Sequence, residues 1–512
     1  MKRIFILLAA AVLLLGGCSD ITLEQLREEN QLGAYGNKEE EQAETLPARS
    51  HISLVFYEDM DVNPLTATNR ENHELLKLVY SPLLRLNEQL KPVYVLAESV
   101  KVSGKTVTVT LKKGLKFSDG SKVTAADAIA SIKTVRNTPA SPYNARLADL
   151  KNYWADNERT FTIKLREENV DIAACLDIPV VKRGKNSVGC GPYRFSRQGG
   201  KQVLVPNKHY FEQPTVQTIY LKAPATDQSA KQMFSVGLLD VYFAGAESDQ
   251  VFSGGKNYTV QSYPGDNLLY LGVNCEDPLL KNRNLRGFLS KLIDRRRITE
   301  NVLLDQADPA AYPYQPGWYK VKESTEAALS DAEKKAQAEA LGLTLSEKAL
   351  LDKKGKQISL SLLVSQGGTM HSDTAKAVAD SFALSGVRIT VEAVSNEEYL
   401  ERLAAGEYQL YLGEIRTGRT LNTNLFAADS AVNFSGATFK KLSEGAAQYK
   451  AGEITLEAFS ALYDAYTPVI PLAYRRGVLY ASSDIGGFRE MSPWALYGDG
   501  TKLVTKETEL KQ

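Results

Sequence analysis

The stretch Leu111-Lys-Lys-Gly-Leu-Lys-Phe-Ser-Asp-Gly120, followed by Val123-Thr-Ala-Ala-Asp127, decides the fold. Residues 106–112 lead into it with alternating polar and apolar side chains, and this period of two predicts a half-buried strand. Phe117-Ser-Asp-Gly120 predicts a turn, because Asp and Gly are favoured where the chain reverses. The segment therefore begins as a strand and then turns back on itself.

A helix is predicted directly after this turn, over residues 125–136. Thr124 precedes it and Asp127 lies three residues later, which is the spacing of a capping box. Ala128, Ile129 and Ile132 fall on one face of the helix and are expected to point inward. The quoted stretch is thus a strand, a turn and a capped helix.

Towards the N-terminus the sequence predicts another strand and another helix. Residues 52–56 read as a strand that Asn63-Pro64-Leu65 ends. Residues 71–84 read as a helix with leucine and valine side chains on one face. These elements open the folded body.

Towards the C-terminus strands and helices alternate. Strands are predicted at 358–364, 387–394 and 408–412, and helices at 373–384 and 397–405. This order predicts an α/β fold in which helices cover a sheet and ligands are bound at the loops that follow the strands.

The N-terminus predicts a secretory signal. Lys2 and Arg3 precede an apolar run of 12 residues, 4–15, which spans roughly 18 Å as a helix and is too short for a bilayer core. Leu15-Gly16-Gly17-Cys18 resembles the lipobox of bacterial lipoproteins. That resemblance implies cleavage after residue 17, lipidation of Cys18, and anchorage at the outer face of the cell membrane, which is the periplasmic side if there are two membranes.

Residues 19–50 are polar and rich in glutamate, which predicts a flexible tether. The remaining body has a globular composition, because 43% of the chain is apolar. The formal net charge is zero, so no nucleic-acid partner is expected. A monomer is expected.

Cysteine and histidine give no sign of a metal or a cofactor, and none is expected. Cys175, Cys190 and Cys275 have no zinc-site spacing, and the four histidines are scattered singly. A Cys175–Cys190 disulfide and buried free thiols both stay open.

Several further motifs occur in the order of one known family. They are Asn63-Pro64-Leu65, the stretch quoted at the start, Gly189-Cys-Gly-Pro-Tyr193, Gly237-Leu-Leu-Asp240, Leu271-Gly-Val-Asn274, Ile293-Asp-Arg295 and Val469-Ile-Pro-Leu-Ala-Tyr474. Together they resemble the large extracytoplasmic solute-binding proteins of ABC importers, in the oligopeptide, dipeptide and nickel-binding family (family 5). The resemblance covers residues 52 to about 490.

This resemblance implies a two-lobed, periplasmic-binding-protein-like fold with mixed sheets covered by helices. The expected parts are the signal 1–18, the tether 19–50, a first lobe of 51–85, 188–267 and 470–505, an inserted subdomain 86–187, and a second lobe 268–469. The chain would cross between the lobes near 267 and 470. A small ligand, expected to be a peptide, would be captured between the lobes and handed to ABC transporter permease subunits.

The resemblance also implies ligand-binding positions. They are Thr68, Asn69, Arg70, Tyr143, Tyr270, Asn274, Glu414, Arg416, Thr417, Arg419, Asn422, Asn424, Asn433 and Phe434. Peptide-binding relatives place a Trp and an Asp in the loop that corresponds to residues 406–422, and this chain has neither there. Glu414 could replace the carboxylate, while Arg416 and Arg419 would suit an anionic ligand group. The alternative is that both arginines are solvated or pair with Glu414.

Other functions are weighed on the same residues. An enzyme is not expected, because the chain has no His-Glu-x-x-His or Gly-x-Ser-x-Gly motif. A receptor for a nickel chelate, haem or an oligosaccharide on the same fold stays open, as does a ligand sensor. His371 would serve a nickel chelate if it faces inward.

Overall fold

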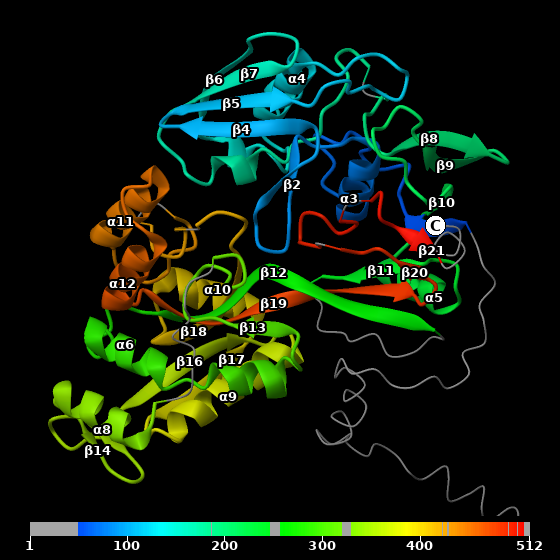
Figure 1. The fold of residues 1–512 in the computed structure, drawn as a ribbon. Helices are drawn as coiled ribbons and strands as arrows, with labels where there is room; N and C mark the ends of the chain where they lie inside the picture. The colour runs from blue at the N-terminus through cyan, green and yellow to red at the C-terminus, as the bar shows by residue number, and fades with distance from the viewer. Residues whose placement is uncertain are drawn as a thin grey trace, which may run out of the picture. The chain divides into compact units, whose positions relative to one another are not determined.

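The structure is a computed structural model that describes residues 50–185, 187–245, 257–319, 329–421, 423–427, 430–489, 491–498 and 500–505 (Figure 1). The signal with Cys18, the tether up to residue 49, and Asn422 lie outside the described residues. None of the helices in these ranges is long and apolar enough to cross a membrane.

A four-stranded sheet carries the N-terminal part of the body. Its order is β1 (His51–Val55), β10 (Thr218–Lys222), β9 (Lys201–Pro206) and β8 (Tyr193–Gln198). β1 runs parallel to β10, with Ile52 opposite Ile219. Helix α3 (Arg70–Val79) buries Leu75, Leu76, Leu78 and Val79 in the core that this sheet shares.

Helix α3 is shorter than the sequence predicts. It ends at Val79 rather than at residue 84, and Leu84–Leu86 form strand β2 instead. Pro82 explains the difference, because proline has no backbone N–H and disfavours a helical conformation at the residue before it. The apolar period continues past the last helical residue because Leu83 and Leu84 are buried in the extended segment.

A second four-stranded sheet holds the segment that opened the sequence analysis. Its order is β4 (Ala97–Ser103), β5 (Thr106–Leu111), β7 (Thr160–Leu165) and β6 (Leu150–Ala155), with all pairs antiparallel. Helix α4 (Ala125–Arg136) lies against β6 and β7, at the top of Figure 1.

The predicted strand, turn and capped helix are all present here. The Gly120 N–H donates to the Phe117 carbonyl, and Gly120 has a φ of +86°, which closes the turn. The Asp127 carboxylate accepts from the backbone N–H of Thr124 at 3.0 Å and from its hydroxyl at 2.6 Å. The cap fixes where the helix begins.

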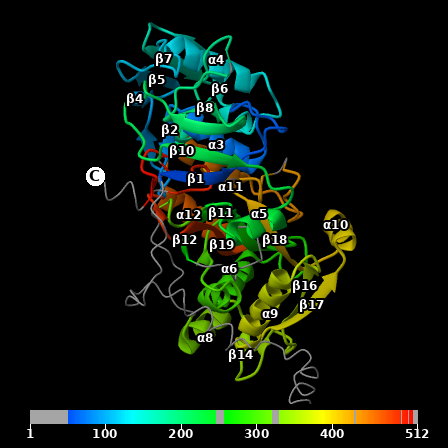
Figure 2. The same cartoon turned by 90° about the vertical axis from the view of Figure 1, so that its right-hand side faces the viewer.

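The largest sheet joins the two halves of the chain. Its order is β11 (Val241–Ala244), β19 (Val469–Ser482), β12 (Tyr258–Val273), β18 (Leu410–Arg416), β16 (Ser359–Ser365) and β17 (Arg388–Val394), with β13 (Ala307–Pro309) also pairing β19. β16 is parallel to both β17 and β18, as the predicted alternation of strands and helices requires. Helix α9 (Thr369–Ala383) packs on β16 and β17 (Figure 2), and α10 (Asn396–Ala405) contacts β16.

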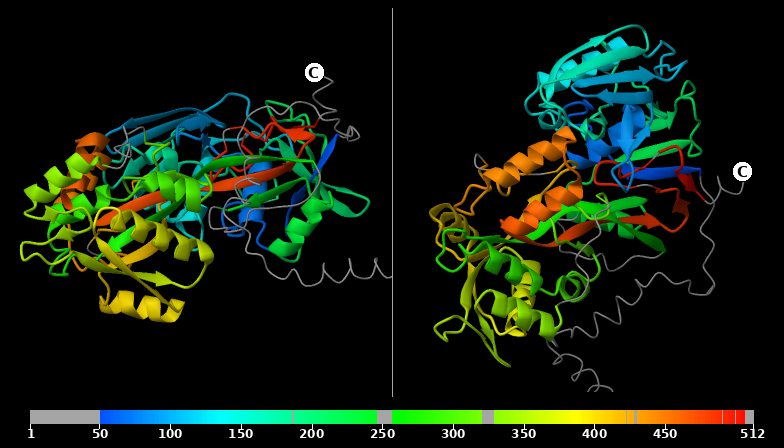
Figure 3. Two further views of the ribbon diagram at one scale, coloured as in Figure 1. Left: turned by 90° about the horizontal axis from the view of Figure 1, so that it is seen from below. Right: turned by 60° about the vertical axis from the view of Figure 1, so that its left-hand side comes forward.

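Strands β12 and β19 run antiparallel beside one another over most of their length (Figure 3). Tyr263 and Leu479 pack in the core of the first two sheets, while Leu268 and Tyr474 pack in a separate core below. The pairing register shifts between Tyr263 and Asn267. One strand pair thus contributes to two cores, and the change from one to the other falls at 264–267 and 475–477.

The remaining elements are short or peripheral. They are β3 (Pro92–Tyr94), η2 (Ala145–Leu147), η3 (Ile172–Cys175), α5 (Asp227–Ser235), α6 (Arg283–Lys291), α7 (Arg295–Arg297), η4 (Ile298–Val302), α8 (Asp331–Ala340), β14 (Thr344–Leu345), β15 (Leu350–Leu351), α11 (Lys440–Ala451), α12 (Leu456–Tyr466), β20 (Ile485–Gly486) and β21 (Val504–Thr505). Cys175, Cys190 and Cys275 are buried and free, so the disulfide that the spacing left open is not formed.

Candidate functional site

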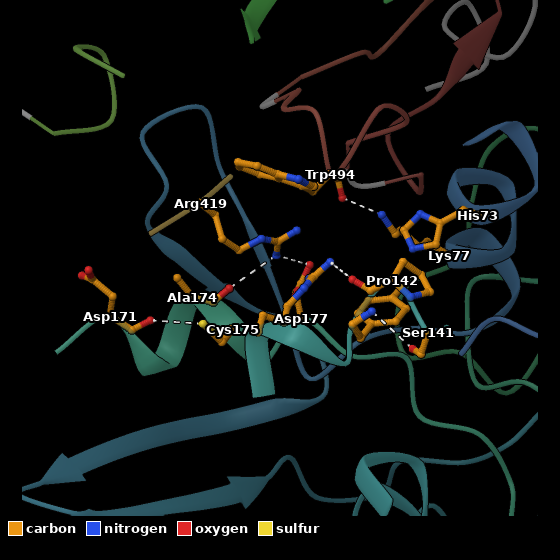
Figure 4. A network of polar contacts seen from close by, with 12 residues as sticks. His73, Lys77, Ser141, Pro142, Asp171, Ala174, Cys175, Asp177, Arg419 and Trp494 are labelled. Atoms are coloured by element: carbon orange, nitrogen blue, oxygen red, sulfur yellow. Dashed lines mark hydrogen bonds and ion pairs between the residues drawn. The ribbon is translucent and has the colours of Figure 1, made fainter. Parts of the chain in front are cut away.

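A buried carboxylate joins the two cores. Asp177, 5% exposed, follows η3 and receives an arginine on each of its oxygens (Figure 4). The Arg146 guanidinium lies 2.5 Å from Oδ1, and the Arg419 guanidinium pairs with Oδ2. Arg146 and Asp177 belong to the segment around the β4–β7 sheet, whereas Arg419 follows β18. The carboxylate therefore ties one half of the body to the other.

Trp494 covers this ion pair from a third segment of the chain. The Arg419 guanidinium lies over the Trp494 ring, 4.3 Å from its centroid, in cation–π geometry. Trp318 packs on the same ring, with 5.0 Å between the centroids. Arg419 also donates to the Ala174 carbonyl at 3.4 Å. Arg419 is consequently held by partners from two separate segments.

Helix α3 adds a second buried ion pair beside the first. Lys77 pairs with Glu74 three residues earlier, and its ammonium also donates to the Trp494 carbonyl at 2.7 Å. The other Glu74 oxygen accepts from the Leu496 N–H at 3.1 Å. His73 Nδ1 lies 3.0 Å from Glu74. Helix α3 is thereby fixed to the segment that carries Trp494.

Burial and neighbouring charges set the ionisation of these groups. Burial opposes the charge on Asp177, but Arg146 and Arg419 outweigh it and lower the pKa of the carboxyl. Glu74 behaves in the same way, since Lys77 and His73 overcome burial and lower its pKa to about 2. Burial, then Lys77, lowers the pKa of His73, which favours the neutral ring. Both carboxylates are therefore charged at neutral pH.

A narrow cavity of about 50 Å³ adjoins the two ion pairs. Glu74, Lys77, Asp177 and Trp494 contribute to its walls, together with the loop that ends at Gly500. This volume suits one or two water molecules or a small polar group. Apolar side chains such as Leu78, Leu84 and Tyr497 form much of the remaining wall, so the charged groups occupy one part of a mainly apolar cavity.

Tyr143 and Arg419 are the predicted ligand residues that this cluster brings together. Tyr143 is fully buried, and the Arg146 guanidinium lies over its ring at 4.6 Å. His73 packs on Tyr143 with 5.2 Å between the ring centroids. Arg419 is only 6% exposed.

Neither arginine of the β18 segment is paired with Glu414, and Arg419 is not solvated either. Glu414 instead lies 3.2 Å from Arg475 and accepts from Asn267 at 3.0 Å. Arg416 lies 3.3 Å from Asp266, and its side chain is 66% exposed. The alternative of solvation or pairing with Glu414 is therefore wrong for Arg419. Arg419 pairs with Asp177 instead, and Glu414 pairs with Arg475.

Two further predicted groups lie near these strand ends. The Thr417 N–H and hydroxyl both donate to the Asp266 carbonyl, at 2.8 and 3.1 Å, where β18 leaves β12. His371 Nε2 lies 3.6 Å from Glu414, so this histidine does face β18. Within the described residues, no group of three or more His, Cys, Asp or Glu is arranged to hold a metal ion.

Tyr270 is placed within the lower core. Its ring lies over Gly413 on β18, while Tyr411 lies over Gly272 on β12, so each tyrosine covers a glycine of the facing strand. The two hydroxyls are 3.3 Å apart. Tyr270 is 4% exposed, which leaves little of its surface for a ligand.

Asn274, Asn433 and Phe434 lie at the far end of the same core. Asn274 donates to the carbonyls of Gly406 and Tyr408, and Asn433 donates to those of Ala427 and Ala437. Phe434 packs edge-on against Tyr411. These side chains hold local backbone and lie apart from the Asp177 cluster.

The three predicted residues at the start of α3 lie near the change of core. Asn69 caps α3 by accepting from the Asn72 N–H at 2.9 Å. Arg70 donates to the Tyr263 hydroxyl at 3.0 Å. Thr68 is exposed, as is Asn424, which lies elsewhere on the β18–α11 connection. Arg70 thus contacts the strand that passes between the cores.

Sequence reasoning missed Asp177, Arg146, Trp494 and Lys77. Asp177 did carry a signal, because it is the only charged residue in the apolar run 172–181. A lone charge in such a run is expected to be buried and therefore to need a partner. Nothing local identifies the partner, since Arg419 is far away in the chain.

Two cores, one strand pair shared between them and a buried polar contact across the junction define a two-lobed solute-binding protein. A sequence model of the middle region of the bacterial extracellular solute-binding proteins, family 5, matches residues 91–429. The chain belongs to this family. The fold class, the family and the binding-protein character that the sequence predicted are confirmed.

Among curated relatives, the chain is similar to the oligopeptide-binding protein AppA of Bacillus subtilis, with 26% identity over 67% of this chain and 68% of that protein. It is also similar to the probable D,D-dipeptide-binding periplasmic protein DdpA of Escherichia coli, with 27% identity over 62% of this chain and 64% of that one. The chain thus spans about two thirds of the length of each of these relatives.

Solved structures share the fold over almost their whole length. The periplasmic murein tripeptide-binding protein MppA, in its unliganded open form, has a TM-score of 0.70 at 19% identity. The match covers 90% of this chain and 98% of MppA. A nickel ABC transporter protein of Bacillus halodurans also has a TM-score of 0.70, at 16% identity, with coverage of 87% and 98%. At these identities the likeness shows the fold alone.

Proposed function

We propose that this chain captures a short peptide between its two lobes and delivers it to the permease of an ABC importer. The observation that carries the proposal is the buried Arg419–Asp177 pair, because its two sides come from opposite sides of the lobe junction. A ligand held between the lobes would contact both of them only when they are closed, and would therefore stabilise the closed form. The polar and aromatic character of the cluster suits a peptide.

Strands β12 and β19 would serve as the hinge. They are the elements that pass from one core to the other, and the register shift at 264–267 interrupts their pairing at that point. Hinge residues are typically a few positions that absorb a change in backbone angles while the packed cores move as rigid bodies. The chain would act as a monomeric binding protein without a catalytic step.

A thermal-shift experiment tests the choice of ligand. The body, from residue 51, is heated with a mixture of tri- to pentapeptides, with nickel–histidine, or with maltooligosaccharides. Peptides are expected to raise the melting temperature by mass action. A shift with nickel–histidine or sugar but not with peptides would contradict the proposal in favour of the other receptor classes.

The anchoring part of the proposal has a separate test. Cys18 would carry the lipid that holds the receptor at the outer face of the membrane. In the full chain, Cys18→Ala is expected to abolish palmitate labelling and to release the protein from the membrane fraction. A membrane-bound variant would contradict a lipid anchor at Cys18.

A further inference from the structure

The segment before η3 caps the end of a helix that belongs to the other lobe. The last turn of an α-helix has backbone carbonyls without partners inside the helix, and on α11 the Lys450 carbonyl accepts from the Val170 N–H at 2.9 Å. The Val170 side chain lies over Gly452, the left-handed residue that ends α11. Ile172 packs in the first core, whereas Leu442 of α11 packs in the second. The contact can therefore form only when the lobes are closed.

Polar side chains flank this contact. Lys450 Nζ lies 2.7 Å from the Asp149 carboxylate, and the Asn169 amide donates to the same oxygen at 2.8 Å. Asn169 in turn accepts from the backbone N–H of Asp171 at 3.0 Å. Asp149 thus pairs with the nearest cation, whereas the Asp171 carboxylate forms no hydrogen bond or ion pair among the described residues.

The neighbours of the Asp171 carboxylate are mostly uncharged. Asp171 is half-buried at this contact. Burial, then the charge of Asp171, raises the pKa of Tyr319 and of Tyr449, so both phenol groups of the other lobe lie close to the carboxylate. On its own segment the thiol of Cys175 stays protonated, because burial raises its pKa to about 11. Closure therefore surrounds the carboxylate with groups that do not stabilise its charge.

The nearby charges do not compensate for this. Lys450 acts on Asp171, but Asp149 already pairs with its ammonium. The Asp171 carboxylate points away from Arg419 (Figure 4). The C-terminal end of α11 carries partial negative charge, which repels a carboxylate beside it. Burial is the dominant influence and raises the pKa of Asp171 to about 6, so the closed form favours the protonated carboxyl over the charged one.

We propose that the contact between residues 169–171 and the end of α11 is an acid-favoured latch, in which Asp171 takes up a proton as the lobes close and releases it as they open. This inference rests on the proposed capture of a ligand by lobe closure and adds a control of that closure by pH. In the open form the solvated carboxyl ionises near its ordinary pKa of about 4, whereas the pKa in the closed form is about 6. The closed form binds more protons in this window, so closure weakens as the pH rises through it.

Calorimetry of the wild-type protein is the primary test. A mixture of tri- to pentapeptides without acidic or histidine side chains is titrated at pH 5 and at pH 7.5, in two buffers that differ in ionisation enthalpy. The two pKa values correspond to about tenfold tighter binding at pH 5. Because Asp171 is only half-buried, we expect a difference of at least threefold. Binding should take up most of one proton at pH 5 and none at pH 7.5.

Two variants assign the effect to Asp171. Asp171→Asn cannot titrate, and it is expected to bind with less than a twofold difference between the two pH values and to take up no proton. Glu168→Gln is the matched control, because Glu168 is an exposed acid of the same segment, and it is expected to keep the pH dependence of the wild type.

Small-angle X-ray scattering gives a measurement that needs no ligand. The radius of gyration of the ligand-free wild type is expected to be smaller at pH 5 than at pH 7.5, because protonation favours closure. Asp171→Asn is expected to have the same radius of gyration at both pH values.

The outcomes separate this inference from the proposed function. Peptide affinity that does not depend on pH, or proton uptake that survives in Asp171→Asn, would overturn the latch and leave peptide capture intact. If no peptide binds but acid compacts the wild type and not Asp171→Asn, the latch stands and peptide capture fails. If no peptide binds and the scattering of the wild type does not change with pH, the inference is overturned.

Discussion

At the scale of the residue, charges in this protein matter most where they are buried. Asp177 and Glu74 are held charged by cations that outweigh burial, whereas Asp171, six residues before Asp177, has no comparable partner. Burial raises the pKa of Asp171 to about 6, and Lys450 only partly opposes this. Folding therefore makes Asp171 harder to ionise, and above pH 6, where the carboxyl is charged, this charge destabilises the folded state.

Asp171→Asn is expected to stabilise the protein above pH 6. In the unfolded chain this carboxyl ionises near its ordinary pKa of about 4, so as the pH rises from about 4 to 6 the unfolded state loses the proton first and the free energy of unfolding falls. Asparagine cannot ionise and so removes that loss. We expect the free energy of unfolding at pH 8 to rise by about 2 kcal/mol, after allowing for the partial exposure of Asp171. Urea unfolding at pH 8 and pH 4 measures it.

The gain should fall to a small fraction of this value at pH 4, where the folded carboxyl is protonated and the unfolded carboxyl is about half protonated. Asp59→Asn serves as the control, because Asp59 is exposed and the substitution should change stability little at either pH. An equal gain for Asp171→Asn at both pH values would contradict a raised pKa as its cause.

At the scale of the element, local patterns predicted most of the secondary structure. The helix at residues 125–136 was predicted with both ends correct, because the Thr124–Asp127 cap fixes its start. Strand β18 continues to Arg416, beyond the predicted end at residue 412, because Asn267 and Leu268 on β12 extend its pairing. Pairing with a distant strand is absent from local sequence, so residues 414–416, with the charged Glu414 and Arg416, could not be recognised as part of a strand.

Strand β19 contains a glycine that we expect to be essential for hinge packing. Gly477 lies opposite Tyr263, and a methyl group there would overlap the tyrosine ring. Gly477 does not have a positive φ, so alanine would introduce no backbone strain. Gly477→Ala is therefore expected to destabilise the protein by about 1–3 kcal/mol through overpacking alone.

Chemical denaturation of single and double variants checks this explanation. Tyr263→Ala removes the ring, so the double variant should be more stable than the sum of the two single effects predicts. Gly287→Ala is the control, because Gly287 has ordinary backbone geometry and more space around it. Gly199 would not serve, because its φ of +55° would add backbone strain. Additive effects of Gly477→Ala and Tyr263→Ala would contradict the steric explanation.

At the scale of the whole molecule, motif order predicted the family and the two-lobed fold, but not the contacts between the lobes. Most of the predicted site residues separate into four groups: the Asp177 cluster, the start of α3, the strand ends at Asp266 and Glu414, and the lower core. Only Arg419 and Tyr143 reach the cluster. Their partners come from segments far away in sequence, and no periodicity or spacing in one chain specifies such pairings.

Closure of the lobes is expected to depend on Arg419 more than on the exposed ion pair nearby. Lys450 on α11 lies 2.7 Å from Asp149, but both side chains are partly exposed, and such pairs contribute only about 0–1 kcal/mol. Removing one partner of a buried pair costs about 3–5 kcal/mol. Arg419→Ala should therefore shift the population to an open form, with a larger radius of gyration in small-angle X-ray scattering.

Lys450→Ala is the matched control and is expected to leave the scattering curve of the wild type unchanged. Both substitutions remove one cation from the same side of the lobe junction. Expansion of the Lys450→Ala variant, or an Arg419→Ala curve that superimposes on that of the wild type, would contradict the expectation that the Arg419–Asp177 pair contributes most to closure of the lobes.

Cys175 gives the protein an intrinsic kinetic reporter. Its thiol is 3% exposed in the segment that supplies Ala174 and Asp177 to the junction, and burial raises its pKa to about 11. A thiol reagent would react only with molecules in which this segment has left its packing in the first core, because that both uncovers the sulfur and restores an ordinary thiolate fraction. The labelling half-life, followed by peptide mapping to separate Cys175 from Cys190 and Cys275, thus times how often the segment beside the junction loosens, and ligands that slow it can be ranked without attaching a dye.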